Sequence, residues 1–175
     1  MPSTRFLERV PHCPDCVMSL VTEVERYPDF IPAMSALRKT KDLPDGFEAE
    51  AMINFKGIVE TFASRITIDP DARTVRVEKA KSGGPVKKLH NRWKFHELSD
   101  GSTLVDFEVD VRLMFPLESL LRQKFDKAKV IIRNVFVEQA MDHCDRVGSI
   151  NPLILTDEVA KLGLDQRLIF APPLV

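Results

Sequence analysis

The sequence predicts an α+β fold in which a curved antiparallel sheet wraps around one long helix near the C-terminus. Residues 47–113 alternate apolar and polar side chains with a period of two, which is typical of strands with one buried and one wet face. Residues 117–147 contain no Gly or Pro and repeat apolar side chains at helical spacing. A single amphipathic helix is therefore expected to follow the sheet.

The composition is that of one globular domain. The chain has 175 residues, of which 44% are hydrophobic and 29% charged, and no apolar run approaches the roughly 20 residues that span a bilayer. The net charge of −1 gives no general attraction to nucleic acid. The first ten residues lack the apolar stretch of a secretory signal, so we expect a cytoplasmic protein in a reducing compartment. The odd count of three cysteines then argues against a disulfide framework.

The elements before the sheet are a strand and a helix. Residues 4–10 read as a short first strand, and Pro14 and Asp15 suit the first turn of a helix, where a missing amide is tolerated and an acid meets the positive helix end. Pro28 and Pro32 end that helix, because a proline biases the residue before it away from helical geometry.

The sheet itself is expected to be a meander of five or six strands. Turn residues separate the alternating segments, among them Gly57 and the run Ser82-Gly83-Gly84-Pro85. The alternating segments are residues 47–55, 58–68, 75–77, 89–95 and 103–113.

The long helix should lie across this sheet. At 1.5 Å per residue, residues 117–147 would extend roughly 45 Å, about the width of a small domain. A twisted sheet of this size curls, so a helix laid in the curl encloses a cavity wherever its side chains do not fill the space. The apolar stripe of the helix consists of Leu117, Leu121, Phe125, Ala128, Ile132 and Val135.

Several separated motifs are similar to those of the coenzyme Q-binding START-domain family, which is also described as polyketide cyclase-like. The first motif is centred on Tyr27, Pro28, Phe30 and Pro32, although Ala33-Met34 stand where the family usually has Trp-Cys. The others are residues 55–65, 84–95 and 103–107. The resemblance implies a START-like helix-grip (Bet v 1-like) domain over residues 1–147. Residues 148–175 form a tail of unassigned role, with one short helical stretch that docks on the domain or a neighbour or stays disordered.

The resemblance implies a non-catalytic carrier or chaperone for ubiquinone that supports respiration or quinone biosynthesis. Ubiquinone is then the expected ligand, no cofactor is required, and the protein would work peripherally at the inner membrane. Relatives in the family are also ribosome-association toxins that block subunit joining, or polyketide cyclases and aromatases. The ribosome and a polyketide substrate are therefore the alternative partners.

The buried face of the predicted sheet is the candidate ligand site. Glu60, Ser64 and Asn91 fall in phase with its apolar residues, and a buried polar group without a partner costs about 1–3 kcal/mol. We expect such groups to be partnered, to face a ligand or water, or to lie near a strand end. Our hypothesis is that Ser64 and Asn91 donate to a quinone carbonyl, whereas Glu60 near a hairpin turn could equally be solvated. The predicted cavity residues are Phe55, Glu60, Phe62, Ser64, Ile66, Leu89, Asn91, Trp93, Phe95, Phe107, Val109, Val111, Leu121, Phe125 and Ile132.

Other chemistry has weaker support in the sequence. The spacing of Cys13 and Cys16 suits a redox pair or zinc, but the strand-helix-strand setting of the redox motif is missing, so we expect neither role. No Gly-x-Ser-x-Gly, phosphate loop or His-Glu-x-x-His motif occurs, so no catalytic residue is assigned. The basic segment 79–94 reads first as a solvated face, then as a contact for anionic lipid, and last as a contact for RNA.

Overall fold

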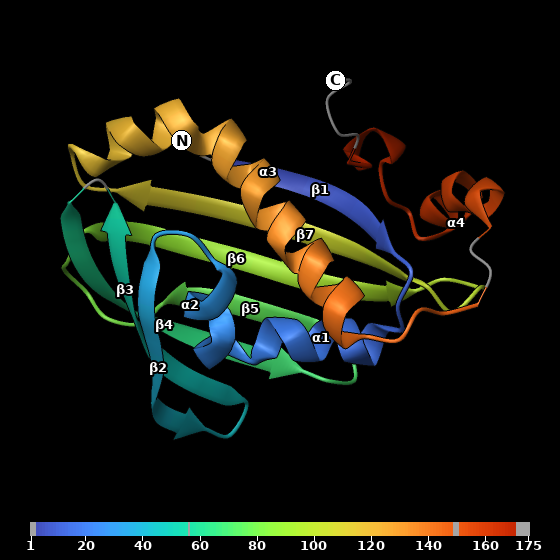
Figure 1. Ribbon diagram of the computed structural model, residues 1–175, viewed down its shortest axis with the longest axis horizontal. Coiled ribbons are helices and arrows are strands. Elements are labelled where there is room, and N and C mark those ends of the chain that lie inside the picture. The colour runs from blue at the N-terminus through green and yellow to red at the C-terminus, as the bar shows by residue number, and fades with distance from the viewer. Residues whose placement is uncertain (1–2, 56, 149–150, 171–175) are drawn as a thin grey trace.

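The computed structural model describes residues 3–55, 57–148 and 151–170 of the chain. Within these residues seven strands form one sheet, and two longer helices pack on it (Figure 1). The strands are β1 (Ser3–Val10), β2 (Met34–Leu43), β3 (Gly46–Phe55), β4 (Ile58–Asp69), β5 (Thr74–Lys79), β6 (Val86–Glu97) and β7 (Thr103–Leu113). The helices are α1 (Pro14–Thr22), α2 (Tyr27–Phe30), α3 (Leu117–His143) and α4 (Leu155–Lys161), with 3-10 turns at Val24–Arg26, Pro152–Ile154 and Gln166–Leu168.

The sheet is antiparallel throughout, in the order β1-β7-β6-β5-β4-β3-β2. Strands β2 to β7 follow one another in the sheet, and β1 forms the far edge beside β7. It pairs with β7 from Ser3↔Asp110 to Val10↔Thr103. Helix α3 crosses the sheet diagonally, and α1 lies on the same side (Figure 1). The expected fold, a curved antiparallel sheet with a long C-terminal helix, is confirmed.

Three features differ from the sequence expectations. Helix α1 ends at Thr22, and Pro28, which was expected to end it, lies in the first turn of α2 instead. Strand β2 has no apolar alternation, since most of its ten residues are exposed and four are charged, as suits an edge strand that must not attract a further strand. Its pairing with β3, for example Arg38↔Glu50, places it in the sheet. Helix α3 ends at His143 instead of Val147, because Cys144 is extended and Arg146 then pairs with His12.

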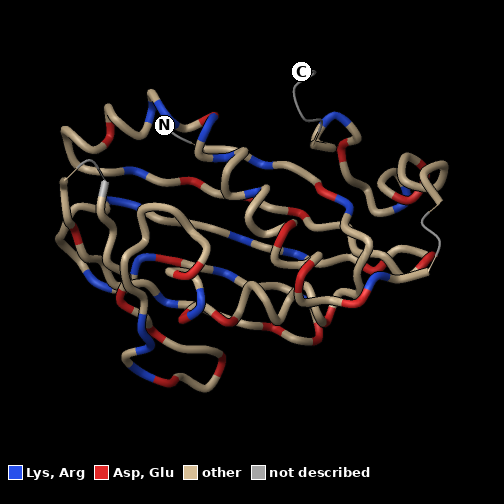
Figure 2. The backbone as a smooth tube through the Cα atoms, viewed as in Figure 1, with Lys and Arg blue, Asp and Glu red and all other residues tan. Residues whose placement is uncertain are grey.

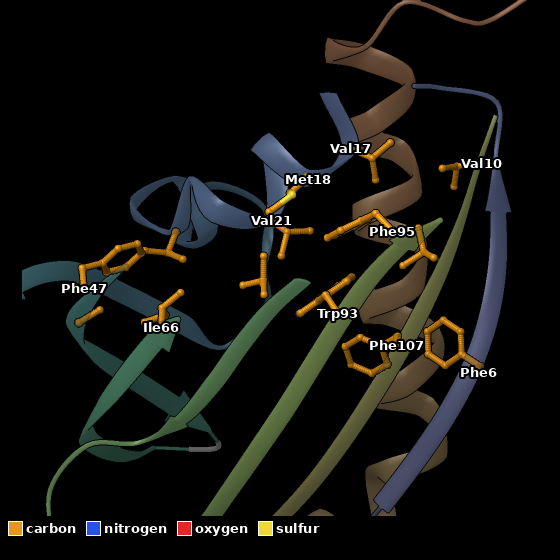
Figure 3. Packing of buried hydrophobic residues seen from close by; sticks show 14 residues of the cluster. Phe6, Val10, Val17, Met18, Val21, Phe47, Ile66, Trp93, Phe95 and Phe107 are labelled. Atoms are coloured by element: carbon orange, nitrogen blue, oxygen red, sulfur yellow. The ribbon is translucent and has the colours of Figure 1, made fainter. Parts of the chain in front are cut away.

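The main core lies between the concave face of the sheet, α1 and α3. Phe6, Trp93 and Phe107 point from neighbouring strands into this layer, and Val17 and Val21 of α1 close it from the other side (Figure 3). Alternation along each strand places these side chains on one face, so their burial stabilises the sheet and α1 together. Helix α3 contributes mainly partly buried residues, and Ala140 alone of its described residues is fully buried.

The described part of the tail docks on the opposite face of the sheet. Leu7 and Leu104 are fully buried there beneath Val159 of α4, and the clustered residues around them include Leu164 and Ile169. The tail then reaches the edge of the sheet, where the Phe170 amide donates to the Leu7 carbonyl at 2.7 Å. The tail thus covers a face and an edge that the family-like part of the chain leaves open.

One disulfide overturns the expectation that the cysteines stay unpaired. Cys16 of α1 is bonded to Cys144, 128 residues later, with their Cα atoms 5.9 Å apart. Both cysteines lie where α1 packs against the end of α3, and this packing brings them together although they are far apart in the sequence. Cys13, the other half of the Cys-x-x-Cys pair, is exposed and free.

Replacing Cys16 with Ser is expected to lower the free energy of unfolding by up to about 5 kcal/mol, because the bond closes a loop of more than a hundred residues in the unfolded chain. Thermal melting with and without a reductant measures this effect. The Cys13→Ser variant serves as the control and should melt like the wild type. Equal melting of Cys16→Ser and the oxidised wild type would contradict the pairing.

Asp100 fastens the tail to the turn between β6 and β7. Its carboxylate accepts hydrogen bonds from the backbone and hydroxyl of Ser102 and from the Asn151 amide, and it pairs with Arg9. Desolvation raises the pKa of this carboxyl, but the hydrogen bonds from Ser102 and Asn151 and the charge of Arg9 outweigh it and lower the pKa to about 2.

Because the folded pKa lies below the usual 3.8, Asp100 contributes stability above that value and loses it as the pH falls from about 4 to about 2. The Asp100→Asn variant should therefore be less stable than the wild type at pH 7, with the difference shrinking across this window. Thermal melts at a series of pH values measure it, with the exposed Asp71→Asn as control. A pH-independent difference would show that Asp100 acts through shape alone.

Candidate ligand-binding site

An apolar cavity of about 40 Å³ lies between the concave face of the sheet, α1 and α3. It has room for a few water molecules, well below the roughly 300–1,000 Å³ of pockets that hold drug-sized ligands. The lining comes from three strands and two helices: Phe6, Glu8 and Val10 of β1, Trp93 of β6, Val105 and Phe107 of β7, Val17, Leu20 and Val21 of α1, and Ile132, Arg133, Phe136, Val137 and Ala140 of α3.

Aromatic rings form the wall of this cavity. Trp93, Phe107 and Phe6 lie together on the sheet side (Figure 3). Trp93 meets Phe107 edge-on with ring centroids 4.6 Å apart, and Phe6 lies 5.0 Å from Phe107. On the helix side, the Phe136 ring lies 5.0 Å from Trp93. Edge-to-face contacts of this kind favour one arrangement of the rings over others. These contacts hold the rings of the sheet side in one arrangement. On the α3 side, Phe136 is the ring that completes the wall.

One ion pair interrupts the apolar lining. The guanidinium of Arg133 binds the carboxylate of Glu8 in a two-point contact, with Nε 3.1 Å from Oε2 and Nη2 2.5 Å from Oε1. These side chains are only 21% and 13% exposed. The Phe170 ring lies 4.9 Å from the guanidinium carbon of Arg133, so the docked tail packs against the pair. Within the described lining, no other residue carries a charge.

The structure brings some of the predicted cavity residues to this cavity and leaves others outside it. Trp93, Phe107 and Ile132 line it. Phe95 and Ile66 are buried in the same core, with Val109 packed against it. Leu89, Val111, Leu121 and Phe125 are half-buried beyond the lining. Phe62 lies by a separate depression of about 200 Å³ near Lys79 and Gly84. The side chain of Phe55 falls outside the described part of the structure.

The three predicted polar residues occupy different environments. Asn91 donates from Nδ2 to the Glu108 carbonyl at 2.9 Å and accepts from Trp93 Nε1 at 2.7 Å, so its amide orients the indole. Ser64 is buried on the concave face but away from the cavity lining. Glu60 is half-buried near the β3–β4 turn, opposite Ile53. In this structure Asn91 thus acts on the wall of the cavity through Trp93.

The Tyr27-Pro28-x-Phe30-x-Pro32 motif supports the site from behind. The rings of Tyr27 and Phe30 lie 5.5 and 5.4 Å from that of Phe136, and the Tyr27 hydroxyl donates to the carbonyl of Val21 in α1. Burial raises the pKa of Tyr27, which keeps the hydroxyl protonated as this bond requires. The motif therefore joins the end of α1 to the residue of α3 that walls the cavity.

Some lining residues that we did not predict as cavity residues nevertheless fall in patterns that the sequence shows. Phe6, Glu8 and Val10 alternate along the first predicted strand, and Phe136 follows Ile132 of the predicted stripe by four residues. Arg133 falls in no such pattern, because a charged residue on an amphipathic helix reads as part of the solvated face.

Two cations of the basic segment 79–94 pair with acidic neighbours. Lys88 pairs with Asp110, and Arg92 pairs with Asp106 and Glu108, both at 3.2 Å. Figure 2 shows the two signs of charge interspersed along the strands. This arrangement favours the interpretation as a solvated face. Elsewhere in the described ranges, no three His, Cys, Asp or Glu side chains gather as metal ligands, and no helix is long and apolar enough to cross a membrane.

Comparison with known proteins decides the family. Residues 10–130 match the sequence model of the family described as "Polyketide cyclase / dehydrase and lipid transport". The chain belongs to this START-like family. It is 32% identical over 136 residues to the mitochondrial coenzyme Q-binding protein coq10 of Schizosaccharomyces pombe, which covers 75% of the chain and 82% of that protein. It is 30% identical over 112 residues to the ribosome association toxin RatA of Escherichia coli K12, covering 63% and 68%.

Solved structures of this START-like family share the fold. The 18 kDa protein CC1736 of Caulobacter crescentus superposes with a TM-score of 0.66 at 29% identity, covering 81% of the chain and 97% of that protein. The Zhui aromatase/cyclase of Streptomyces sp. R1128 superposes with a TM-score of 0.66 at 16% identity, covering 79% and 93%. The second likeness shows the fold alone.

Truncating Phe136 tests the packing of this START-like cavity. The Phe136→Ala variant is expected to lose about 2–3 kcal/mol of unfolding free energy, because it removes a partly buried ring that contacts Tyr27, Phe30 and Trp93. Denaturant unfolding measures the loss. Ile131→Ala is the control, since that neighbouring side chain is 45% exposed and should change stability by well under half as much. Equal losses in both variants would contradict the wall described for α3.

Proposed function

We propose that this protein is a non-catalytic carrier that binds ubiquinone or a similar isoprenoid lipid between the sheet and α3. The observation that carries the proposal is the aromatic-walled cavity with one charged pair at its side, in a chain similar over most of its length to a coenzyme Q-binding protein. Ligand sites are commonly apolar with a few placed polar groups. A quinone ring fits such a wall through its flat apolar faces and its carbonyl oxygens.

A ligand of this size requires α3 to move outward, since the cavity of about 40 Å³ is smaller than a quinone ring. The packing of α3 permits such a movement. Most of its described residues are exposed or half-buried, and its end is tied to α1 by the Cys16–Cys144 bond. Displacement of the unanchored part of the helix would open the space beneath Phe125 and Leu121 to an isoprenoid tail.

The loop before α3 offers an apolar contact for a membrane. Phe115 is 83% exposed and Met114 47% exposed, in a position next to the helix that must move. Large exposed apolar side chains in one place mark interaction sites. We therefore assign the expected peripheral contact with the inner membrane to this loop in preference to the basic segment, where Lys88 and Arg92 pair with acidic neighbours. The predicted contacts of Ser64 and Asn91 with a quinone carbonyl remain part of the proposal for the ligand-bound state.

Ribosome association is the second candidate, favoured by the similarity to RatA over 112 residues. Cyclase activity has less support, because the charged groups of the described lining, Glu8 and Arg133, bind each other and leave no free acid or base.

Organic extraction of the purified full chain, followed by mass spectrometry, tests the carrier proposal. We expect ubiquinone or a related isoprenoid in near-stoichiometric amount, either as purified or after incubation with quinone-containing liposomes. A Phe115→Asp variant should load from liposomes several-fold more slowly, with the exposed Leu153→Asp as control. An empty extract under both conditions would contradict the proposal, and binding to ribosomal subunits would then be measured.

In cells, loss of a quinone carrier should impair respiration, and a short-chain quinone that reaches the membrane unaided should relieve the defect. A defect that persists with the short-chain quinone, together with fewer joined ribosomes on overexpression, would favour the ribosomal role.

A further inference from the structure

We propose that Glu8 and Arg133 form the polar end of the ligand site and select an uncharged head group with carbonyl oxygens over an anionic one. The inference rests on the proposed carrier function and names the groups that would determine which lipid is carried. The sequence analysis assigned a role to neither residue.

The position of the pair is the first argument. Glu8 projects from β1 and Arg133 from α3, so they meet across the side of the cavity between the edge strand and the helix. Their low exposure, 13% and 21%, means that both charges are largely withdrawn from water. A charged pair in an otherwise apolar wall is expensive to bury, and removing one partner would leave the other uncompensated.

The remaining hydrogen-bonding capacity of Arg133 is the second argument. A guanidinium has five N–H donors. Three are used, since Nε and Nη2 donate to Glu8 and Nη1 donates to Asn134 Oδ1 at 2.9 Å. Two N–H groups therefore remain for a further acceptor. Phe170 packs against the guanidinium, whose carbon lies 4.9 Å from the centroid of the ring. This contact restrains Arg133 further, so little side-chain freedom remains to be lost on binding.

Charge balance then determines the kind of ligand. The carboxylate of Glu8 already neutralises Arg133, so the polar end of the cavity carries no net charge. A carbonyl oxygen can accept from the unused N–H groups without disturbing the pair. A fatty-acid carboxylate would place a second negative charge beside Glu8 at low dielectric, or would have to displace it, and either event lowers its affinity. The same geometry therefore favours a quinone over an ionised fatty acid of equal chain length.

The chain contains a single tryptophan, Trp93, and it lines this cavity, so binding can be followed directly. A decyl-substituted benzoquinone, as an electron-accepting ring in contact with the indole, should quench the emission of the full-length protein saturably. Undecanoate, which does not quench, is then added as a competitor of similar chain length. In the wild type we expect undecanoate to restore the emission only at concentrations at least about tenfold above those of the quinone, as one lost charge-assisted contact implies.

Two variants separate the roles of the pair. Glu8→Gln removes the negative charge and should make undecanoate about tenfold more effective relative to the quinone, as the ratio of the two affinities in that variant measures. Arg133→Gln should weaken the quinone about tenfold. Glu23→Gln removes a carboxylate from an exposed pair outside the cavity and should change neither affinity.

The outcomes distinguish this inference from the proposed function. Absence of saturable quenching in the wild type would overturn carrier function itself. Quenching with equal affinity for quinone and undecanoate, or unchanged competition in Glu8→Gln, would leave the carrier role standing and overturn the selectivity. If Glu8→Gln does not fold, the wild-type preference and Arg133→Lys decide, because Lys keeps the charge but loses the two-point contact and should still weaken the quinone.

Discussion

The contact between α3 and the concave face of the sheet is the constraint on which the rest of the structure depends. The sheet presents an aromatic face that must be withdrawn from water, and α1 covers only part of it. Helix α3 covers the remainder, yet of its described residues only Ala140 is fully buried. It is anchored at one end by the disulfide to α1 and at its middle by Phe136 and Arg133. A cover attached in this way protects the apolar face and can still be displaced.

The attachments of α3 come from different parts of the chain and differ in kind. The Tyr27 motif holds Phe136 by edge-to-face aromatic contacts, which favour one relative orientation of the rings. Glu8 holds Arg133 by a two-point ionic contact, which is directional. The tail adds Phe170 beside this contact after crossing the outer face of the sheet. Residues beyond the matched family region thus contribute to the side of the cavity where a ligand head group would lie.

A fold of this kind serves carriers, ribosome-binding toxins and cyclases among its relatives, so the function depends on what lines the cavity. Here the described lining is apolar except for a neutralised ion pair, an arrangement suited to holding an uncharged amphiphile. The outer face carries charges of both signs in pairs, with Asp106 buried between Arg5 and Arg92. Such a face keeps the sheet solvated, and the exposed side chains of Met114 and Phe115 lie in the loop just before α3.

The sequence by itself determined the architecture, because alternation and helical spacing are local patterns that specify which face of each element is buried. It therefore predicted the strands from residue 47 onward, the long helix, and Trp93, Phe107 and Ile132 as residues facing the interior. It could not show β2, whose exposed residues carry no such pattern. Only the tertiary structure decided that Cys16 joins Cys144, that Glu8 meets Arg133, and that the tail covers Leu7. These contacts join residues more than a hundred positions apart, and their formation depends on the curvature of the sheet and the path of α3, which no local spacing encodes.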